Sequence, residues 1–272
     1  MSARAVTLWF IDTVDPAGLL ARGVANDATA AGRLAAAIYG DSVLLPVIDT
    51  DLGTAMNADD SHVYAGHYGP LSVLSCSLFA TNRPAGLSRT VSTISPSAAA
   101  TLLFTDPASG TGSFARWENG TLKRAFSATP VDIFEDQGLP YPFERPFWAG
   151  EHPLNYAPGV APDPLALPFH PQQLAEESNR AWLGFRFTHP LLPTDVDPAT
   201  IPVTGYAIHP ADYVPTPDDL DRYHAASART ATPPQPGAAE GHEDGDPESG
   251  EPVSESKPRG RFARYFGFGT NS

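Results

Sequence analysis

The residues best suited to chemistry lie in one proline-rich stretch, residues 146–171, which we call the clamp. Its main candidates to exchange protons or bind a metal ion are Glu151, His152 and His170. Two histidines and a carboxylate can serve together as a general acid and base, or as metal ligands. The aromatic residues Trp148 and Phe169 belong to the same stretch and are candidate ligand-binding residues. We therefore look for a site first in the clamp.

The two histidines also have a purely structural interpretation. Each precedes a proline, and the proline ring disfavours the α conformation of the residue before it, so His152 and His170 are held extended. His170 would then cap a helix that begins at Pro171. In this interpretation both rings pack or cap within an aromatic core. In the alternative, they converge with Glu151 and with Glu176 or Glu177.

A further catalytic candidate is Asp12, which directly follows the apolar run of residues 5–11. In open α/β sheets, ligands bind at the carboxyl ends of the strands, where Asp12 would lie. No local metal motif such as His-Glu-x-x-His is present. We accordingly predict no metal site and no cofactor.

Composition and charge exclude several classes of protein. The 272 residues carry a net charge of −14, which repels nucleic-acid backbones, so we predict no nucleic-acid partner. Cys76 is the only cysteine, which excludes an internal disulfide, and its apolar surroundings indicate a buried structural thiol. We find neither a signal peptide nor an apolar run long enough to span a membrane. We therefore expect a cytoplasmic protein without a transmembrane segment.

Apolar runs and turn signals predict an α/β or α+β fold with a mixed sheet. Residues 5–11 predict a central strand covered on both faces. Two helices lead to a strand at 43–48: the first is capped by Asp15 and covers residues 16–22, and the second runs from a cap at Asn26 or Asp27 to Tyr39. This β-α-α-β start favours a parallel crossover that pairs the two strands. Asn119-Gly120 predicts an antiparallel hairpin over residues 113–127.

The second half of the chain is harder to interpret. Residues 130–171 lack a sustained period but are rich in aromatic side chains, Tyr156 among them, which predicts a long packed loop rather than a solvated linker. A late helix is expected at residues 172–184, and residues 185–187 are a possible final strand. The hairpin residues Arg116, Glu118, Lys123 and Arg124 are expected at wet positions.

We predict three regions along the chain. Residues 1–214 form a single globular domain, and residues 215–256 form an acidic Pro/Gly-rich disordered linker. Residues 257–272 form a basic and aromatic tail tip. The tip is a candidate for binding a protein partner or the acidic domain. Its few cations would support only weak peripheral contact with a membrane.

Three sequence boxes carry a resemblance to a known family. They are Trp-Glu-Asn-Gly at 117–120, Phe-Trp-Ala-Gly-Glu-His-Pro at 147–153, and Leu-Pro-Phe-His-Pro at 167–171, the last leading into a helix with Glu176-Glu177. With the apolar strand at the start, they resemble an uncharacterised bacterial family of unknown function over roughly residues 5–187. The resemblance implies no activity and no catalytic residues.

Two functional hypotheses follow. The first is a noncatalytic binding or regulatory protein that uses the clamp, and it is favoured because no catalytic motif is complete. The second is a hydrolase-like enzyme that uses Glu151, His152 and His170 in acid/base or metal-binding roles. The sequence identifies neither a ligand nor a substrate, and it leaves the oligomeric state open.

Overall fold

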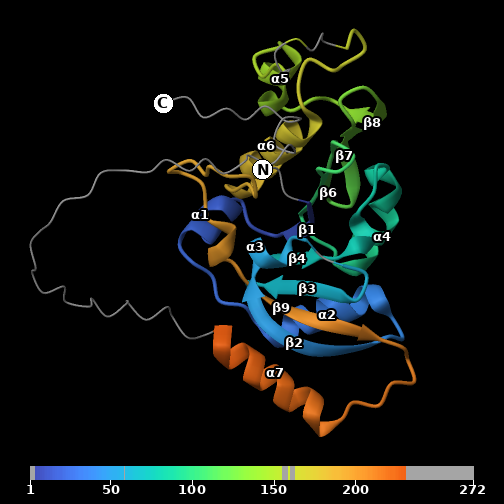
Figure 1. Cartoon of the computed structure of the whole chain (residues 1–272), viewed down its shortest axis with the longest axis vertical. Helices are drawn as coiled ribbons and strands as arrows, with labels where there is room; N and C mark the ends of the chain where they lie inside the picture. Colours follow the sequence, from blue (N-terminus) through green and yellow to red (C-terminus); the bar gives the residue numbers. More distant parts are fainter. Residues whose placement is uncertain (1–3, 58, 155–158, 160–162, 231–272) are drawn as a thin grey trace, which may run out of the picture.

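Nine strands form one antiparallel sheet in the computed structural model, which describes residues 4–57, 59–154, 159 and 163–230 (Figure 1). The strands are β1 Ala5–Ile11, β2 Val43–Asp51, β3 His62–His67, β4 Leu71–Ser75, β5 Ala99–Asp106, β6 Thr111–Glu118, β7 Thr121–Ala128, β8 Ile133–Gly138 and β9 Pro202–His209. Their order in the sheet is β2-β9-β3-β4-β1-β5-β6-β7-β8. The first strand of the chain is therefore the central strand of the sheet.

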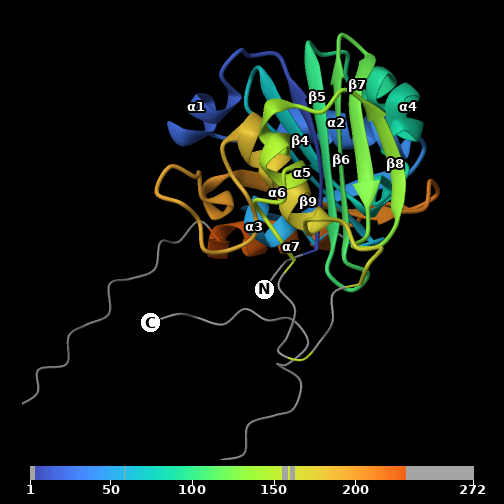
Figure 2. The same cartoon turned by 90° about the horizontal axis from the view of Figure 1, so that it is seen from above.

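Helices lie on both sides of this sheet, α6 on one side and α4 on the other (Figure 2). The α-helices are α1 Pro16–Ala21, α2 Ala28–Tyr39, α3 Leu52–Ala55, α4 Ser88–Ile94, α5 Arg145–Trp148, α6 Pro171–Leu183 and α7 Pro217–Thr230. Short 3-10 turns are η1 Ser77–Phe79, η2 Pro84–Leu87, η3 Pro142–Glu144 and η4 Pro198–Thr200.

Strand β1 contributes to a hydrophobic core on each face of the sheet. One core receives Val6, Leu8 and Phe10, and the other receives Ala5, Trp9 and Ile11. The first core is covered by α2 and α4, and the second by α1 and α6. Every residue of β1 is buried, so the prediction of a central strand covered on both faces is confirmed.

The predicted parallel pairing of the first two strands is wrong. Strand β1 pairs antiparallel with β4 and β5, whereas β2 pairs with β9, from Val43 opposite His209 to Asp51 opposite Pro202. A continuous apolar run indicates only that both faces of a strand are buried. Helices cover both faces of this antiparallel sheet, so the run carries no information on strand direction. The α+β alternative is confirmed.

Several local predictions are confirmed. Asp15 and Asp27 cap α1 and α2, because their carboxylates accept hydrogen bonds from the amides of Gly18 and Ala30. The hairpin of β6 and β7 turns at Asn119 and Gly120, with φ values of 49° and 73°, as a type I′ turn requires. Cys76 is buried, and burial raises the pKa of its thiol to about 11.

Strands β8 and β9 were not predicted, and the possible final strand at residues 185–187 is not formed. Strand β8 lies within the predicted loop, and β9 lies in the Pro- and Asp-rich stretch that follows α6. Both begin near proline and contain glycine, which weakens their strand signal. Residues 185–187 are not a strand; Phe185 and Phe187 instead fill the core beside Trp9.

Helix α7 lies along edge strand β2, inside the segment predicted as linker (Figure 1). The Asp49 amide donates to Ser227 Oγ (3.1 Å), and the Tyr223 hydroxyl donates to Asp49 Oδ2 (2.9 Å). The predicted start of the linker at residue 215 is therefore too early. The remaining linker, residues 231–256, and the tip, residues 257–272, lie outside the described residues.

Removal of α7 should destabilise the sheet at β2. We expect a chain that ends at residue 214 to lose about 1–3 kcal/mol of unfolding free energy relative to one that ends at 230, because two hydrogen bonds and their packing are lost. Urea denaturation would measure the difference. Tyr223→Phe should account for about 1 kcal/mol of it, and equal stabilities of the two truncated chains would contradict the contact.

A buried ion pair fastens the segment just before the clamp to the sheet. The Arg124 guanidinium has no exposed surface and donates to both carboxylate oxygens of Glu144, at 3.0 and 2.8 Å. It also pairs with Asp136 and lies over the Phe126 ring. The prediction that Arg124 is exposed to solvent is therefore wrong. Arg124 is buried because η3 and α5 cover this face of β7.

Loss of Arg124 should be far more costly than loss of its neighbour across the hairpin. Arg116 is opposite Arg124 in the β6–β7 register and is partly exposed. We expect Arg124→Gln to cost about 3–5 kcal/mol, because Glu144 would stay buried without its partner. Arg116→Gln should cost at most about 1 kcal/mol. Urea denaturation of both variants tests this, and similar losses would contradict it.

Candidate functional site

The clamp is packed against the sheet through its aromatic residues. Phe147 and Phe169 are buried, and the Trp148 ring meets those of Phe126 and Phe169 edge-on at 5.9 and 4.9 Å. Trp148 retains 37% of its surface, whereas Phe169 retains none, so only Trp148 of the two is accessible to a ligand. Tyr156 lies outside the described residues.

The three catalytic candidates of the clamp lie in different surroundings. The exposed His152 ring stacks on Phe147, with centroids 4.1 Å apart. His170 caps α6, where its Nδ1 accepts a hydrogen bond from the Gln172 amide (3.3 Å), and burial lowers its pKa. The Glu151 side chain is exposed. Among the described residues, no hydrogen bond or ion pair joins these three.

Asp12 connects the end of β1 to the approach of β5. Its Oδ1 accepts a hydrogen bond from the Ala98 amide (2.7 Å), and its own amide donates to the Pro70 carbonyl (2.8 Å). Within the described part of the chain, no cluster of three or more His, Cys, Asp or Glu side chains could hold a metal ion. The same part of the chain contains no helix with the length and apolar character needed to cross a membrane.

Glu176 on α6 is a buried carboxylate with a structural task. Its Oε2 accepts a hydrogen bond from the Phe187 amide (2.8 Å), and its Oε1 accepts one from the Thr188 hydroxyl (3.3 Å). It thereby fastens the segment after α6 to the helix. Burial raises its pKa from 4.5 to about 7, against the opposing effect of these hydrogen bonds. The neighbouring Glu177 is partly exposed and pairs with Arg180.

The raised pKa of Glu176 predicts a pH-dependent stability. The folded state binds the Glu176 proton more tightly than the unfolded state does. The contribution of this proton to the free energy of unfolding is therefore complete below pH 4.5 and is lost as the pH rises through about 7. We expect Glu176→Gln to gain stability over the wild type between pH 5 and 8, by up to roughly 3 kcal/mol. Urea denaturation across this range measures the gain. Glu177→Gln is the control, and a pH-independent difference for Glu176→Gln would contradict the assignment.

The larger of two hollows lies at the end of the sheet where β1 stops. It encloses about 490 Å³ and brings together the β1–α1 loop, the approach to β5, the end of β6 and α6. The lining residues that matter most are Thr13, Val14, Ala98, Arg116, Glu118 and Trp182. Asp12, though not itself lining the hollow, positions both the loop and Ala98 through its hydrogen bonds.

One charged pair and one aromatic ring give this hollow its chemistry. Arg116 Nε donates to Glu118 Oε1 (3.0 Å), and the Arg116 guanidinium lies 5.2 Å from the centre of the Trp182 ring. Tyr141 packs edge-on against Trp182 at 5.4 Å. Burial, reinforced by the Glu118 charge, raises the Tyr141 pKa. The site thus combines a flat apolar surface with a positive and a negative group.

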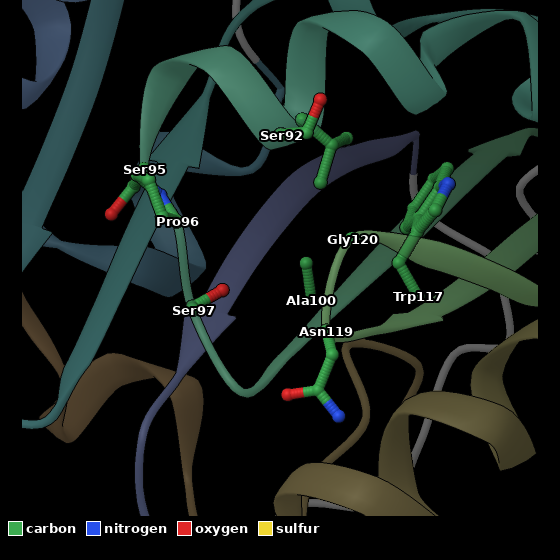
Figure 3. A pocket seen from close by; sticks show the side chains of 9 residues that line it. Ser92, Ser95, Pro96, Ser97, Ala100, Trp117, Asn119 and Gly120 are labelled. Atoms are coloured by element: carbon green, nitrogen blue, oxygen red, sulfur yellow. The ribbon is translucent and has the colours of Figure 1, made fainter.

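A smaller hollow of about 240 Å³ lies between α4 and the hairpin turn (Figure 3). Ala100 and the Trp117 ring line it, and the Ser95 hydroxyl points away from Trp117. Asn119 lines both hollows. The hairpin turn therefore separates the two, and neither hollow is lined by any clamp residue that the structure describes.

The Asn119-Gly120 signal predicted a hairpin turn and no binding site. The only local signal for a site was the Trp-Glu-Asn-Gly box, each of whose four residues lines one or both hollows. Arg116 and Trp182 are far apart in the chain, and no spacing rule connects them. Their contact follows from the packing of α6 on β6.

Comparison with known proteins agrees with the resemblance noted in the sequence. A family model described as a family of unknown function (DUF6928) matches residues 5–206. No curated protein and no solved structure matches the chain.

Proposed function

Because the chain belongs to this family of unknown function, we propose a function from its geometry: a noncatalytic binding protein whose ligand occupies the larger hollow. The observation that carries the proposal is the Arg116–Glu118 pair beside Trp182 in a hollow of about 490 Å³. That volume is typical of ligand sites, which range from about 300 to 1,000 Å³. Tryptophan and arginine are also the residues that most often dominate binding energy.

The rim supports a ligand with an apolar body. The Val14 side chain is fully exposed at the edge of the hollow. A ligand could cover Val14 and pack an aliphatic or aromatic group against Trp182.

The charges favour a cationic group on that ligand. The Glu118 side chain is 39% exposed, whereas that of Arg116 is 20% exposed, so Glu118 is the more accessible partner. The net charge of −14 adds a long-range attraction for cations. We therefore propose a compact ligand, or a peptide side chain, that joins a cation to an apolar group.

Location and partners remain proposals. The net charge of −14 supports a protein without nucleic-acid partners, as predicted from the sequence, and we keep the cytoplasmic location as a proposal. The segment just before the clamp supports the site, because Tyr141 and Phe143 both pack against Trp182.

Titration with matched probes tests the proposed site. We expect arylalkylamines to bind and shift the Trp182 indole and Asn119 amide NMR signals. Arylalkylcarboxylates should bind with a dissociation constant at least about tenfold higher. Glu118→Gln and Trp182→Ala should each weaken amine binding by about tenfold or more. Trp148→Phe is the control, because Trp148 lies in the clamp and outside the hollow.

Two results would overturn this proposal. One is an unchanged Trp182 signal with every probe. The other is turnover of ester, amide or phosphate substrates that is abolished by His152→Ala or His170→Ala, which would instead support the hydrolase-like alternative.

A further inference from the structure

Strand β8 forms an edge of the sheet that is open within the described residues. It pairs with β7 on one side, and no described strand or backbone hydrogen bond occupies its other side. The opposite edge, β2, differs because α7 lies against it and accepts an amide hydrogen bond there. An open edge presents a row of backbone donors and acceptors to which another strand can be added.

Exposed aliphatic side chains flank this edge. Val131 and Ile133 retain 45% and 47% of their surface, and Leu139, directly after the strand, retains 86%. Such residues are costly to leave in water and would be covered by an added strand. The exposed carboxylates Asp132 and Asp136 lie between them in the chain; because Asp136 is already ion-paired with Arg124, the negative charge at this edge comes chiefly from Asp132.

The charges determine which strand fits. A second copy of β8 would place these acidic side chains opposite or next to their own counterparts, which is unfavourable across a strand pair. A strand with cations and aromatic groups is complementary. Residues 259–268 of this chain have that composition, with Arg259, Arg261, Phe262, Arg264, Tyr265, Phe266 and Phe268, and they contain no proline.

We propose that the open edge of β8 binds the chain's own residues 259–268 as an added strand. Aromatic residues favour strands, and backbone pairing would supply most of the contacts. This inference is independent of the ligand proposed for the larger hollow.

The length of the chain allows this contact within one molecule. Helix α7 lies at β2, eight strand spacings from β8, or roughly 38 Å. A random-coil chain of about 28 residues has an r.m.s. span of about 29 Å and a contour length of about 90 Å, and residues 231–258 supply that number of residues. Tethering also gives an effective concentration in the millimolar range.

Amide hydrogen exchange on the full chain tests the proposal. We expect Ala263→Pro to speed exchange of the β8 amides that face outward by about tenfold or more, because proline removes a donor and interrupts a strand. Ser254→Pro, placed in the connecting segment, is the matched control and should leave β8 unchanged. Both positions follow, in the sequence, every residue that forms the core, so neither substitution should unfold the domain.

A synthetic peptide and a charge-reversal variant provide two further tests of the contact at β8. A synthetic peptide of residues 257–272 should restore protection to the Ala263→Pro protein, whereas the same peptide with Ala263→Pro should not. Asp132→Lys should reduce protection of β8 in the full chain, and Asp41→Lys, an exposed carboxylate next to the other edge strand, should not.

The outcomes separate the alternatives. Equal exchange of β8 in the wild type and in Ala263→Pro would overturn the proposal. Protection that appears only as the protein concentration rises would assign the contact to a second molecule and overturn the intrachain form. If Ala263→Pro shifts the Trp182 indole signal and leaves β8 unchanged, the tip occupies the larger hollow instead.

Discussion

The structure depends on one guanidinium that has no access to water. Arg124 occupies the inner face of β7 and is neutralised by the buried Glu144 and by Asp136. A buried charge is tolerated only when its partners are fixed, so the 139–148 segment must lie over the sheet. That segment begins the cover of Phe114 and Phe126, and it places Tyr141 and Phe143 beside Trp182. The same ion pair that positions the clamp thus shapes one wall of the larger hollow.

The sequence supports predictions of local structure where a single residue decides the backbone. Asp15, Asp27 and His170 were expected to cap helices and do so, because a cap needs only its own side chain and the next amides. Asn119-Gly120 determined the hairpin for the same reason. The apolar run of β1 correctly indicated burial on both faces. These features depend on neighbours within a few residues.

Features that depend on distant partners could not be predicted in this way. The partner of β2 is β9, which begins with Pro202 and contains Gly205, and neither residue favours a strand. The burial of Arg124 depends on a segment that covers it from outside the hairpin. The candidate site shows the same limit: His152 and His170 attracted attention by their local motif, whereas Arg116 and Trp182 meet only after α6 packs on β6.

The helix along β2 has a consequence for how this sheet can grow. With one edge occupied by α7 and the other open within the described residues, strand addition can occur at one end only. A sheet with two open edges can propagate from molecule to molecule into a fibre, because each added copy offers a new template. A sheet with one closed edge can pair with one further strand or sheet but cannot propagate beyond it. Any assembly formed through its edges is limited to a single partner, and its stoichiometry is therefore determined by α7.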